Sequence, residues 1–384
     1  MFFLKKMMAV FLAVMICVPF SVSVGALSDN EITAPSAVLI DQKTGKVLYE
    51  KNAHEVRACA SITKVMTLTL VMEAIDSGKI SLSDTVTASE HASSMGGSDI
   101  WLEVGETMTV DEMIKATVVA SANDAAVALA EYICGTEDEF VSQMNKKAKA
   151  LGMKETVFKN CNGLDEDGHV TSAYDVAVMS RELTKHKKIY DYSNIWMDTL
   201  RGGKTQLVNT NKLLKSYRGI TGLKTGTTSK AGSCISATAE RDGLSLIAVV
   251  LGSQTGKSRF SDAAKILDYG FANYGMYTPK VPEGALTEIS VNNGMTDKIK
   301  TNAKIDTSFL IKKGESEKIS SEIILPQEIE APVEKGAVLG KIIYKSDSKQ
   351  IAEYPITAAQ DAEQINFMKI FEMIFRSIAG NIVV

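Results

Sequence analysis

Ser61 and Lys64 have the types and the spacing of a serine nucleophile with its own base. A serine hydroxyl is a weak nucleophile and needs a base within hydrogen-bond reach. If Ser61 opens a helix, both side chains lie on one helix face, one turn apart. Lysine accepts a proton only when it is neutral, and desolvation or a nearby cation lowers its pKa. The pattern alone is weak, because a Ser followed by Lys more often marks a helix start with a solvated charge.

A second polar string, Ser121-Ala122-Asn123, interrupts an otherwise apolar sequence. Polar groups in such surroundings lie near the core and must be paired. The structural alternative is a helix cap or a local turn, which Ser and Asn both favour. The functional interpretation is a loop between two helices that points Ser121 at a leaving group and Asn123 at a substrate amide.

A third string, Lys224-Thr225-Gly226-Thr227, is typical of a strand near a sheet edge. Gly226 removes a side chain where another backbone or a ligand approaches closely. A substrate amide can add beside such a strand, while Lys224 and the Thr hydroxyls hold a carboxylate. The backbone N–H groups of Ser61 and Thr227 are candidates for an oxyanion hole. The alternative is an ordinary turn that contains glycine.

Together and in this order, the three strings equip the chain for acyl transfer through a serine ester. This chemistry needs no metal and no cofactor, and the four histidines of the chain show no metal-ligand spacing. With a formal net charge of -4, the 384-residue chain has no electrostatic footprint for nucleic acid.

The elements around the strings predict the fold. Strand patterns lie at both ends of the region that holds the strings, and helix patterns lie between them. The expected hairpins cover 37–50 and 234–251, and the expected helices cover 64–75, 111–133, 144–151, 172–184 and 260–274. This order predicts an α/β (α+β) fold, with one antiparallel sheet flanked by helices and an inserted helical subdomain. Short β-type runs after 278 predict a small all-β domain.

Both ends of the chain differ from the rest. Lys5 and Lys6, an apolar stretch and small residues up to Ala26 have the pattern of a signal peptide. From 365 onward, Phe and Ile residues share one helical face, and the charges within it argue against a spanning helix. An amphipathic helix in a membrane interface fits this pattern, and packing on its own domain is the alternative. The expected division is 1–26 signal peptide, 27–277 catalytic domain, 278–360 β-rich domain and 361–384 anchor helix.

The three strings, with segments around them, resemble the D-alanyl-D-alanine carboxypeptidases, which are serine-type, low-molecular-mass penicillin-binding proteins. Similar segments lie at 97–98, 102–106, 162–164, 169–175 and 207–214. The resemblance implies a β-lactamase/transpeptidase-like fold. It also implies roles for the residues: Ser61 as nucleophile, Lys64 as base, Ser121 as proton relay, and Asn123, Lys224, Thr225, Gly226 and Thr227 as substrate-binding residues.

The implied activity is removal of the terminal D-Ala from peptidoglycan stem pentapeptides through an acyl-enzyme, with β-lactams as inhibitors. The implied location is the extracytoplasmic face of the cell membrane, with the C-terminal helix as anchor. One position departs from the family pattern. Ser245 stands where many members carry a basic residue, so Lys224, Thr225 and Thr227 are expected to bind more of the carboxylate.

Other functions remain open from the sequence. A β-lactamase of class A needs a glutamate for deacylation, and no convincing Glu-x-x-x-Asn element lies between Asn123 and Lys224. A non-catalytic penicillin-binding sensor needs a transmembrane span joined to a signalling module, which the sequence does not show. A simple wall-binding module needs neither Ser61 nor Lys64.

Overall fold

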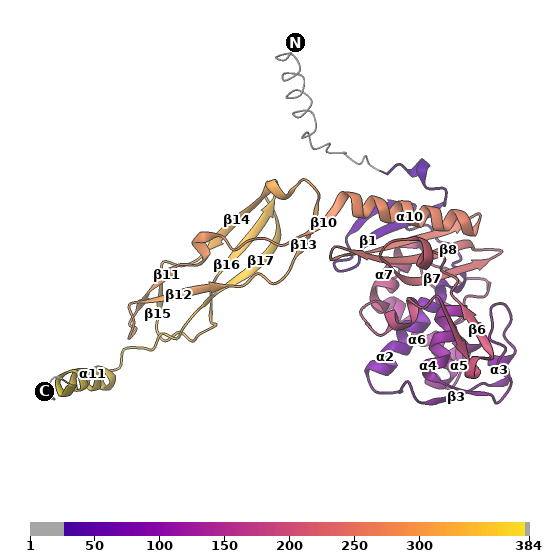
Figure 1. The fold of residues 1–384 in the computed structure, drawn as a ribbon, viewed down its shortest axis with the longest axis horizontal. Helices are drawn as coiled ribbons and strands as arrows, with labels where there is room; N and C mark the ends of the chain where they lie inside the picture. The colour runs from indigo at the N-terminus through magenta and orange to yellow at the C-terminus, as the bar shows by residue number, and fades with distance from the viewer. Residues whose placement is uncertain (1–26, 381–384) are drawn as a thin grey trace, which may run out of the picture.

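The computed structural model describes residues 27–380, so the expected signal peptide lies outside the described residues. Figure 1 shows a mixed α/β domain on one side, an elongated β-rich domain on the other, and helix α11 at the far end of the latter. The three strings of interest all lie in the α/β domain.

The centre of this domain is an antiparallel sheet of five strands in the order β2-β1-β9-β8-β7. Its strands come from the beginning and the end of the domain: β1 Ser36–Asp41, β2 Val47–Lys51, β7 Ile220–Thr228, β8 Gly232–Arg241 and β9 Leu244–Ser253. Both predicted hairpins are present, and β1 pairs with β9 along its whole length. The predicted fold, one sheet built from distant segments around a helical insert, is confirmed.

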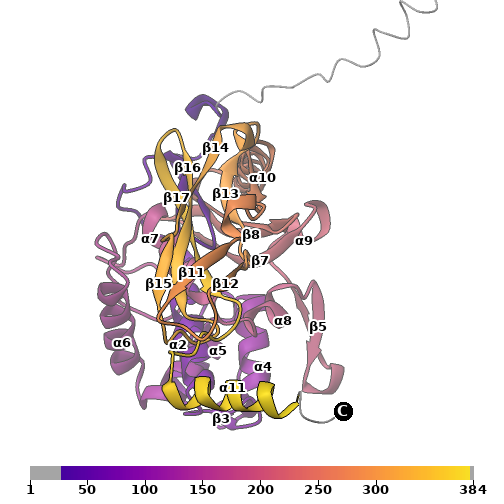
Figure 2. The same ribbon diagram turned by 90° about the vertical axis from the view of Figure 1, so that its left-hand side faces the viewer.

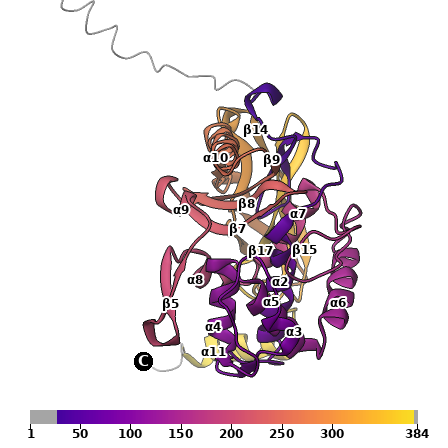
Figure 3. The same ribbon diagram turned by 90° about the vertical axis from the view of Figure 1, so that its right-hand side faces the viewer.

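Both faces of the sheet are buried, which explains the nearly continuous apolar runs of its central strands. Successive side chains of a strand point to opposite faces. Val38 and Val249 therefore pack into one apolar cluster with helices α2 (Lys64–Asp76) and α7 (Ala173–Leu183). Leu39 and Val250 pack into a second cluster with α10 (Gly256–Asn273). Figure 3 shows α10 on one side of β7 and β8, and α2 and α5 on the other.

The helical insert follows the predicted pattern with longer or broken elements. The remaining elements of the domain are β3 Thr85–Thr87, α3 Glu90–Ser93, β4 Thr107–Thr109, α4 Val110–Lys115, α5 Asn123–Cys134, α6 Glu137–Ala150, α8 Ile189–Ser193, β5 Met197–Leu200, β6 Thr205–Val208 and α9 Leu213–Ser216. Helix α6 begins seven residues before the predicted start at 144, because Thr136 caps it and three acidic residues occupy its first turn.

The β-rich domain follows, joined by a two-stranded pairing of β10 with β13. Its strands are β10 Tyr274–Tyr277, β11 Glu288–Asn292, β12 Lys298–Ala303, β13 Phe309–Lys312, β14 Ile319–Ile324, β15 Glu328–Glu330, β16 Val338–Ser346 and β17 Lys349–Ala358. Six of them form the sheet β14-β16-β17-β12-β11-β15, which faces the viewer in Figure 2.

Helix α11, Phe367–Gly380, is the last element. The large apolar side chains described on it are exposed, among them Phe367 at 78%, Phe371 at 58% and Phe375 at 63%. None of the helices within residues 27–380 has the length and apolarity to cross a membrane.

Candidate active site

Ser61 lies in a tight turn that leads into α2. The turn is the 3-10 helix η2, Ala60–Thr63, and α2 continues from it at Lys64. Ala60 has the left-handed φ of 50°, and Gly163 packs so closely that a Cβ there would lie 2.1 Å from the carbonyl oxygen of Ala60. The turn is therefore held from outside, and the half-buried Ser61 is presented in a fixed orientation.

Lys64 is fully buried and its ammonium nitrogen has three oxygen partners. The Nζ atom lies 3.1 Å from Ser61 Oγ, 2.5 Å from Asn123 Oδ1 and 2.7 Å from the carbonyl oxygen of Asn162. Burial lowers the pKa of Lys64 to about 7, against smaller opposing effects of Cys161, Asp99 and Asp124. Near neutral pH a substantial fraction of this amine is unprotonated and can take the Ser61 proton.

Ser121 and Asn123 lie where the predicted helix 111–133 breaks. A short π-helix, Ala116–Ala120, ends at Ser121, which has a left-handed φ of 63°. Helix α5 starts at Asn123. Both side chains are buried. The Asn123 amide is bound on both sides, because its Nδ2 donates to the Gly96 carbonyl at 2.6 Å while its Oδ1 accepts from Lys64.

Strand β7 is the edge strand of the sheet, as predicted, and brings Lys224 into the same site. Lys224 Nζ donates to Ser121 Oγ at 2.8 Å and to the Thr225 carbonyl at 2.9 Å. Burial, followed by the cations Lys64 and Arg259, holds the pKa of Lys224 well below its usual range. The site thus contains two buried amines, each bonded to a serine hydroxyl.

Gly226 is where β7 touches the Ser61 turn. A Cβ at this position would lie 2.8 Å from the Cys59 carbonyl oxygen and 2.9 Å from the Ser61 amide nitrogen. Only glycine allows this approach. Next to it, Thr225 Oγ1 donates to Thr210 Oγ1 at 2.6 Å, and Thr227 Oγ1 to the Gly226 carbonyl at 2.8 Å. All eight predicted site residues are therefore brought together by the fold.

Arg259 is a site residue that the sequence reasoning missed. From the first turns of α10 its Nη1 donates to Thr227 Oγ1 at 2.8 Å and to the Gly226 carbonyl at 2.9 Å. A signal was present, because Arg259, Ala263 and Ile266 share the core-facing stripe of this helix, an unusual place for an arginine. Ser245, by contrast, bonds Glu240 at the opposite end of the β8–β9 hairpin and lies away from this site.

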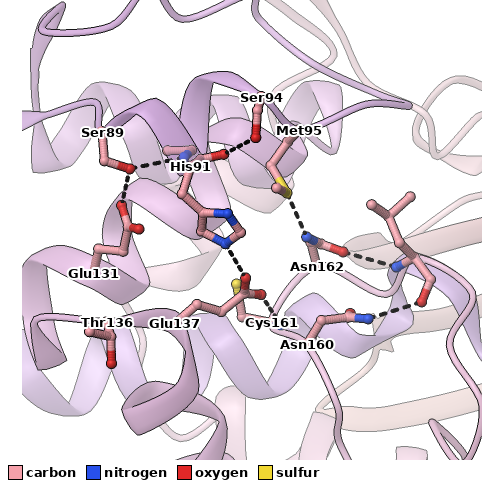
Figure 4. Close-up of polar contacts among 12 residues, drawn as sticks. Ser89, His91, Ser94, Met95, Glu131, Thr136, Glu137, Asn160, Cys161 and Asn162 are labelled. Carbon is pink, nitrogen blue, oxygen red and sulfur yellow. Dashed lines mark hydrogen bonds and ion pairs between the residues drawn. The ribbon is translucent and has the colours of Figure 1, made fainter.

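The carbonyl of Asn162, the third partner of Lys64, is positioned by a network of side chains (Figure 4). Glu137, at the start of α6, accepts the Cys161 amide at 2.8 Å and the His91 Nε2 atom at 2.8 Å. Asn162 Nδ2 contacts the Met95 sulfur at 3.5 Å. The network ties α3, α6 and the 160–162 loop together immediately behind Lys64.

His169 supports the nucleophile turn rather than the reaction. It is buried, its Nδ1 accepts the Lys159 amide at 3.1 Å, and its Nε2 lies 2.7 Å from Thr63 Oγ1. These partners place the proton on Nε2, so that His169 donates to Thr63, which donates to the Ala60 carbonyl. Burial lowers the pKa of His169 to about 4, which keeps the ring neutral at physiological pH.

Four cysteines of the described residues are free, and Cys59, Cys161 and Cys234 are buried. Among residues 27–380, no group of three or more His, Cys, Asp or Glu side chains is arranged to hold a metal ion. The site consists of two serines, two buried amines, an arginine and an open strand edge. This arrangement can bind an extended peptide with a terminal carboxylate and transfer its acyl group to Ser61.

Comparison with known proteins agrees with this geometry. Residues 23–255 match the family described as D-alanyl-D-alanine carboxypeptidase, and residues 277–364 match the penicillin-binding protein 5 C-terminal domain. The carboxypeptidase DacF of Bacillus subtilis is 44% identical over 95% of this chain and 96% of its own length.

Solved structures are similar as well. Penicillin-binding protein 5 from Haemophilus influenzae is 31% identical, with a TM-score of 0.71 over 88% of this chain and 100% of that chain. Penicillin-binding protein D2 from Listeria monocytogenes, solved with ampicillin bound, is 34% identical, with a TM-score of 0.58 over 64% of this chain and 100% of that one.

Proposed function

The chain belongs to the D-alanyl-D-alanine carboxypeptidase family, and on this basis we propose that Ser61 is the nucleophile with which it removes the terminal D-Ala of peptidoglycan stem peptides. The observation that carries the assignment is the bond between Ser61 Oγ and the buried, pKa-lowered amine of Lys64. A serine paired with a base within hydrogen-bond reach is the required arrangement for nucleophilic catalysis.

In the first half of the reaction, Ser61 Oγ attacks the carbonyl carbon of the penultimate D-Ala while Lys64 takes the hydroxyl proton. The backbone N–H groups of Ser61 and Thr227 stabilise the oxyanion. Ser121, bonded to Lys224, relays the proton that Lys64 took from Ser61 to the departing nitrogen, so that the C–N bond breaks, D-alanine leaves and Lys64 is neutral again. The remaining acyl group is an ester of Ser61, which water then hydrolyses with Lys64 as base.

The two cations have different roles in this scheme. Lys224 has a lowered pKa and its Nζ points at Ser121, which suits a proton relay. Arginine keeps its charge in proteins and presents several donors to a carboxylate. Arg259, which already bonds Thr227 Oγ1, is therefore the residue that holds the substrate carboxylate together with Thr225 and Thr227.

A β-lactam carries an amide carbonyl and a carboxylate in a similar arrangement. We expect it to acylate Ser61, in line with the ampicillin-bound Listeria relative. Besides the leader-like pattern of the N-terminal sequence, two features support a membrane-facing enzyme: helix α11 projects from the end of the β-rich domain (Figure 1), and Phe side chains on it are exposed. We propose an exported protein that α11 anchors at the membrane surface.

The direct test is D-alanine release from a peptide ending in D-Ala–D-Ala by the purified protein. Ser61→Ala should abolish release and penicillin labelling, while Ser245→Ala, a matched change at the far end of the sheet, should alter neither. Absence of D-alanine release from the unmodified protein, with rapid turnover of penicillin, would refute the assignment.

Membrane attachment is tested separately. Deletion of 365–384 should move the protein from the membrane fraction to the soluble fraction without loss of penicillin labelling. Retention of the shortened protein on membranes would exclude α11 as the anchor.

A further inference from the structure

Trp101 has an unusual environment at the edge of the active site. It is 80% exposed, more than the other exposed large apolar side chains among the described residues. It also has a left-handed φ of 55°, which is rare for a bulky residue. Backbone strain of this kind persists only where the surroundings impose it, and it clusters at functional sites.

The surroundings of Trp101 hold its backbone rigidly. The Asp124 carboxylate accepts the amides of Ile100 and Leu102 at 3.0–3.2 Å. Arg201 donates to the carbonyls of Ile100 at 2.9 Å and Trp101 at 3.3 Å, and is itself paired with Glu106. The neighbours Ile100 and Leu102 are buried, so the loop anchors itself on both sides and holds the indole in solvent.

The same loop lines the substrate site. The backbone N–H of Asn123 donates to the Ser98 carbonyl at 2.6 Å, and a Cβ on Gly97 would lie 2.9 Å from the side-chain Nδ2 of Asn123. Trp101 is three residues further on, at most about 11 Å from Ser98 between Cα atoms. Asp124, which fixes the Trp101 backbone, directly follows Asn123. The Trp101 backbone is thus tied to the segment that carries Asn123, the residue that binds Lys64.

We propose that Trp101 is a stacking platform for an N-acetylated amino sugar of the peptidoglycan strand. The inference rests on the proposed function, because the stem peptide joins the scissile bond to the glycan. An extended pentapeptide spans at most about 18 Å, so the sugar next to it comes within reach of a side chain at this distance from the site. In this proposal Trp101 extends the peptide site toward the sugar.

The chemistry of the indole fits this ligand. Its face is apolar and carries partial negative charge, which attracts the partly positive C–H groups on the flat face of a pyranose ring. A pre-positioned aromatic ring loses little conformational entropy on binding, which is why Trp is frequent among residues that dominate binding energy. The indole is 80% exposed, and Glu103 and Val104 on the same loop are exposed as well.

The test compares two substrates that differ only in the sugar: a soluble pentapeptide ending in D-Ala–D-Ala, and the same pentapeptide on its N-acetylated disaccharide. Trp101→Ala should raise KM for the disaccharide substrate by about 3- to 10-fold, the worth of one aromatic contact. Its kcat/KM on the free peptide should stay within about twofold. Trp101→Phe should keep most of the sugar effect, and Val104→Ser should change neither substrate.

A second readout does not depend on activity. The chain has two tryptophans, and Trp196 is half-buried with Lys215 Nζ over its ring. In a Trp196→Phe background, tri-N-acetylchitotriose should change the Trp101 fluorescence saturably. An equal loss on both substrates in Trp101→Ala, or no fluorescence change at millimolar chitotriose, would overturn the proposal. Failure of the unmodified protein to release D-alanine would instead overturn the proposed function and leave the sugar-binding result readable.

Discussion

A methyl group on Gly226 tests how closely strand β7 must approach the nucleophile turn. A Cβ there would lie 2.8 Å from the Cys59 carbonyl oxygen, 2.9 Å from the Ser61 amide and 3.0 Å from the Ala60 Cβ, whereas ordinary contact begins at 3.4 Å. Two of the three atoms are backbone and cannot rotate away. Because interiors are close-packed, the turn must shift by about 0.6 Å. The φ of Gly226 is not in the left-handed region, so the effect of alanine is steric.

The consequence for catalysis follows from the distance between Ser61 Oγ and Lys64 Nζ. It is 3.1 Å, and a shift of this size takes it to about 3.7 Å, beyond the range of a hydrogen bond. A misplacement approaching 1 Å costs about 100-fold in rate. We therefore expect Gly226→Ala to slow acylation of Ser61 by about 100-fold while the protein stays folded.

The assay is the second-order rate of labelling by a fluorescent penicillin, with D-alanine release measured in parallel. Gly275→Ala is the control, because a Cβ on this strand glycine would lie 3.6 Å from the flexible Lys313 side chain. Thermal unfolding should show both variants folded. If Gly226→Ala labels within twofold of the unmodified protein, the close approach of β7 is not what positions Ser61.

Three further changes test other parts of the site. Since the protonated form of Lys64 predominates below its pKa of about 7, kcat/KM should fall about tenfold per pH unit below that value and level off above it; a rate still rising at pH 9 would contradict this. Arg259→Gln should lower kcat/KM about 10- to 100-fold on a peptide with a free terminal carboxylate but not on its amide, and Arg259→Lys should recover part of the loss; equal losses on both peptides would exclude a role in carboxylate binding. Glu137→Gln should slow acylation roughly 3- to 10-fold and shift the pH dependence of kcat/KM. Glu139→Gln, on the same helix and bonded to Gln143, should change neither. An unchanged pH dependence in Glu137→Gln would show that the network of Glu137 has a structural role only.

The sequence was sufficient for the chemistry that depends on residue type and local spacing. Ser61 and Lys64 are neighbours along one turn, and the polar break at Ser121 is visible against its apolar flanks. The antiparallel sheet follows from β-branched runs at both ends of the domain. These predictions succeed because each rests on interactions within one or two elements.

The sequence could not predict contacts that arise only when distant elements pack. Arg259 enters the site because α10 packs against the sheet and places this side chain next to β7. Asn162 contributes a backbone carbonyl, and a pattern of side chains in the sequence does not predict such a contact. The position of Ser245 also depends on how distant segments pair. Ser245 lies at the start of β9, and the register of the β8–β9 hairpin places it at the end away from Thr227.

The order of the strands has a consequence for how the protein is made. Strand β1 is fully buried and needs β9 as its partner, yet β9 is synthesised only after the entire helical region. Until then β1 has an open apolar edge, and such edges promote aggregation in incomplete chains. Strand β7, which holds Lys224, belongs to the same late segment. A nascent chain therefore contains Ser61 long before its active site is complete. Labelling by penicillin measures the folding of the completed domain, not merely the presence of the serine.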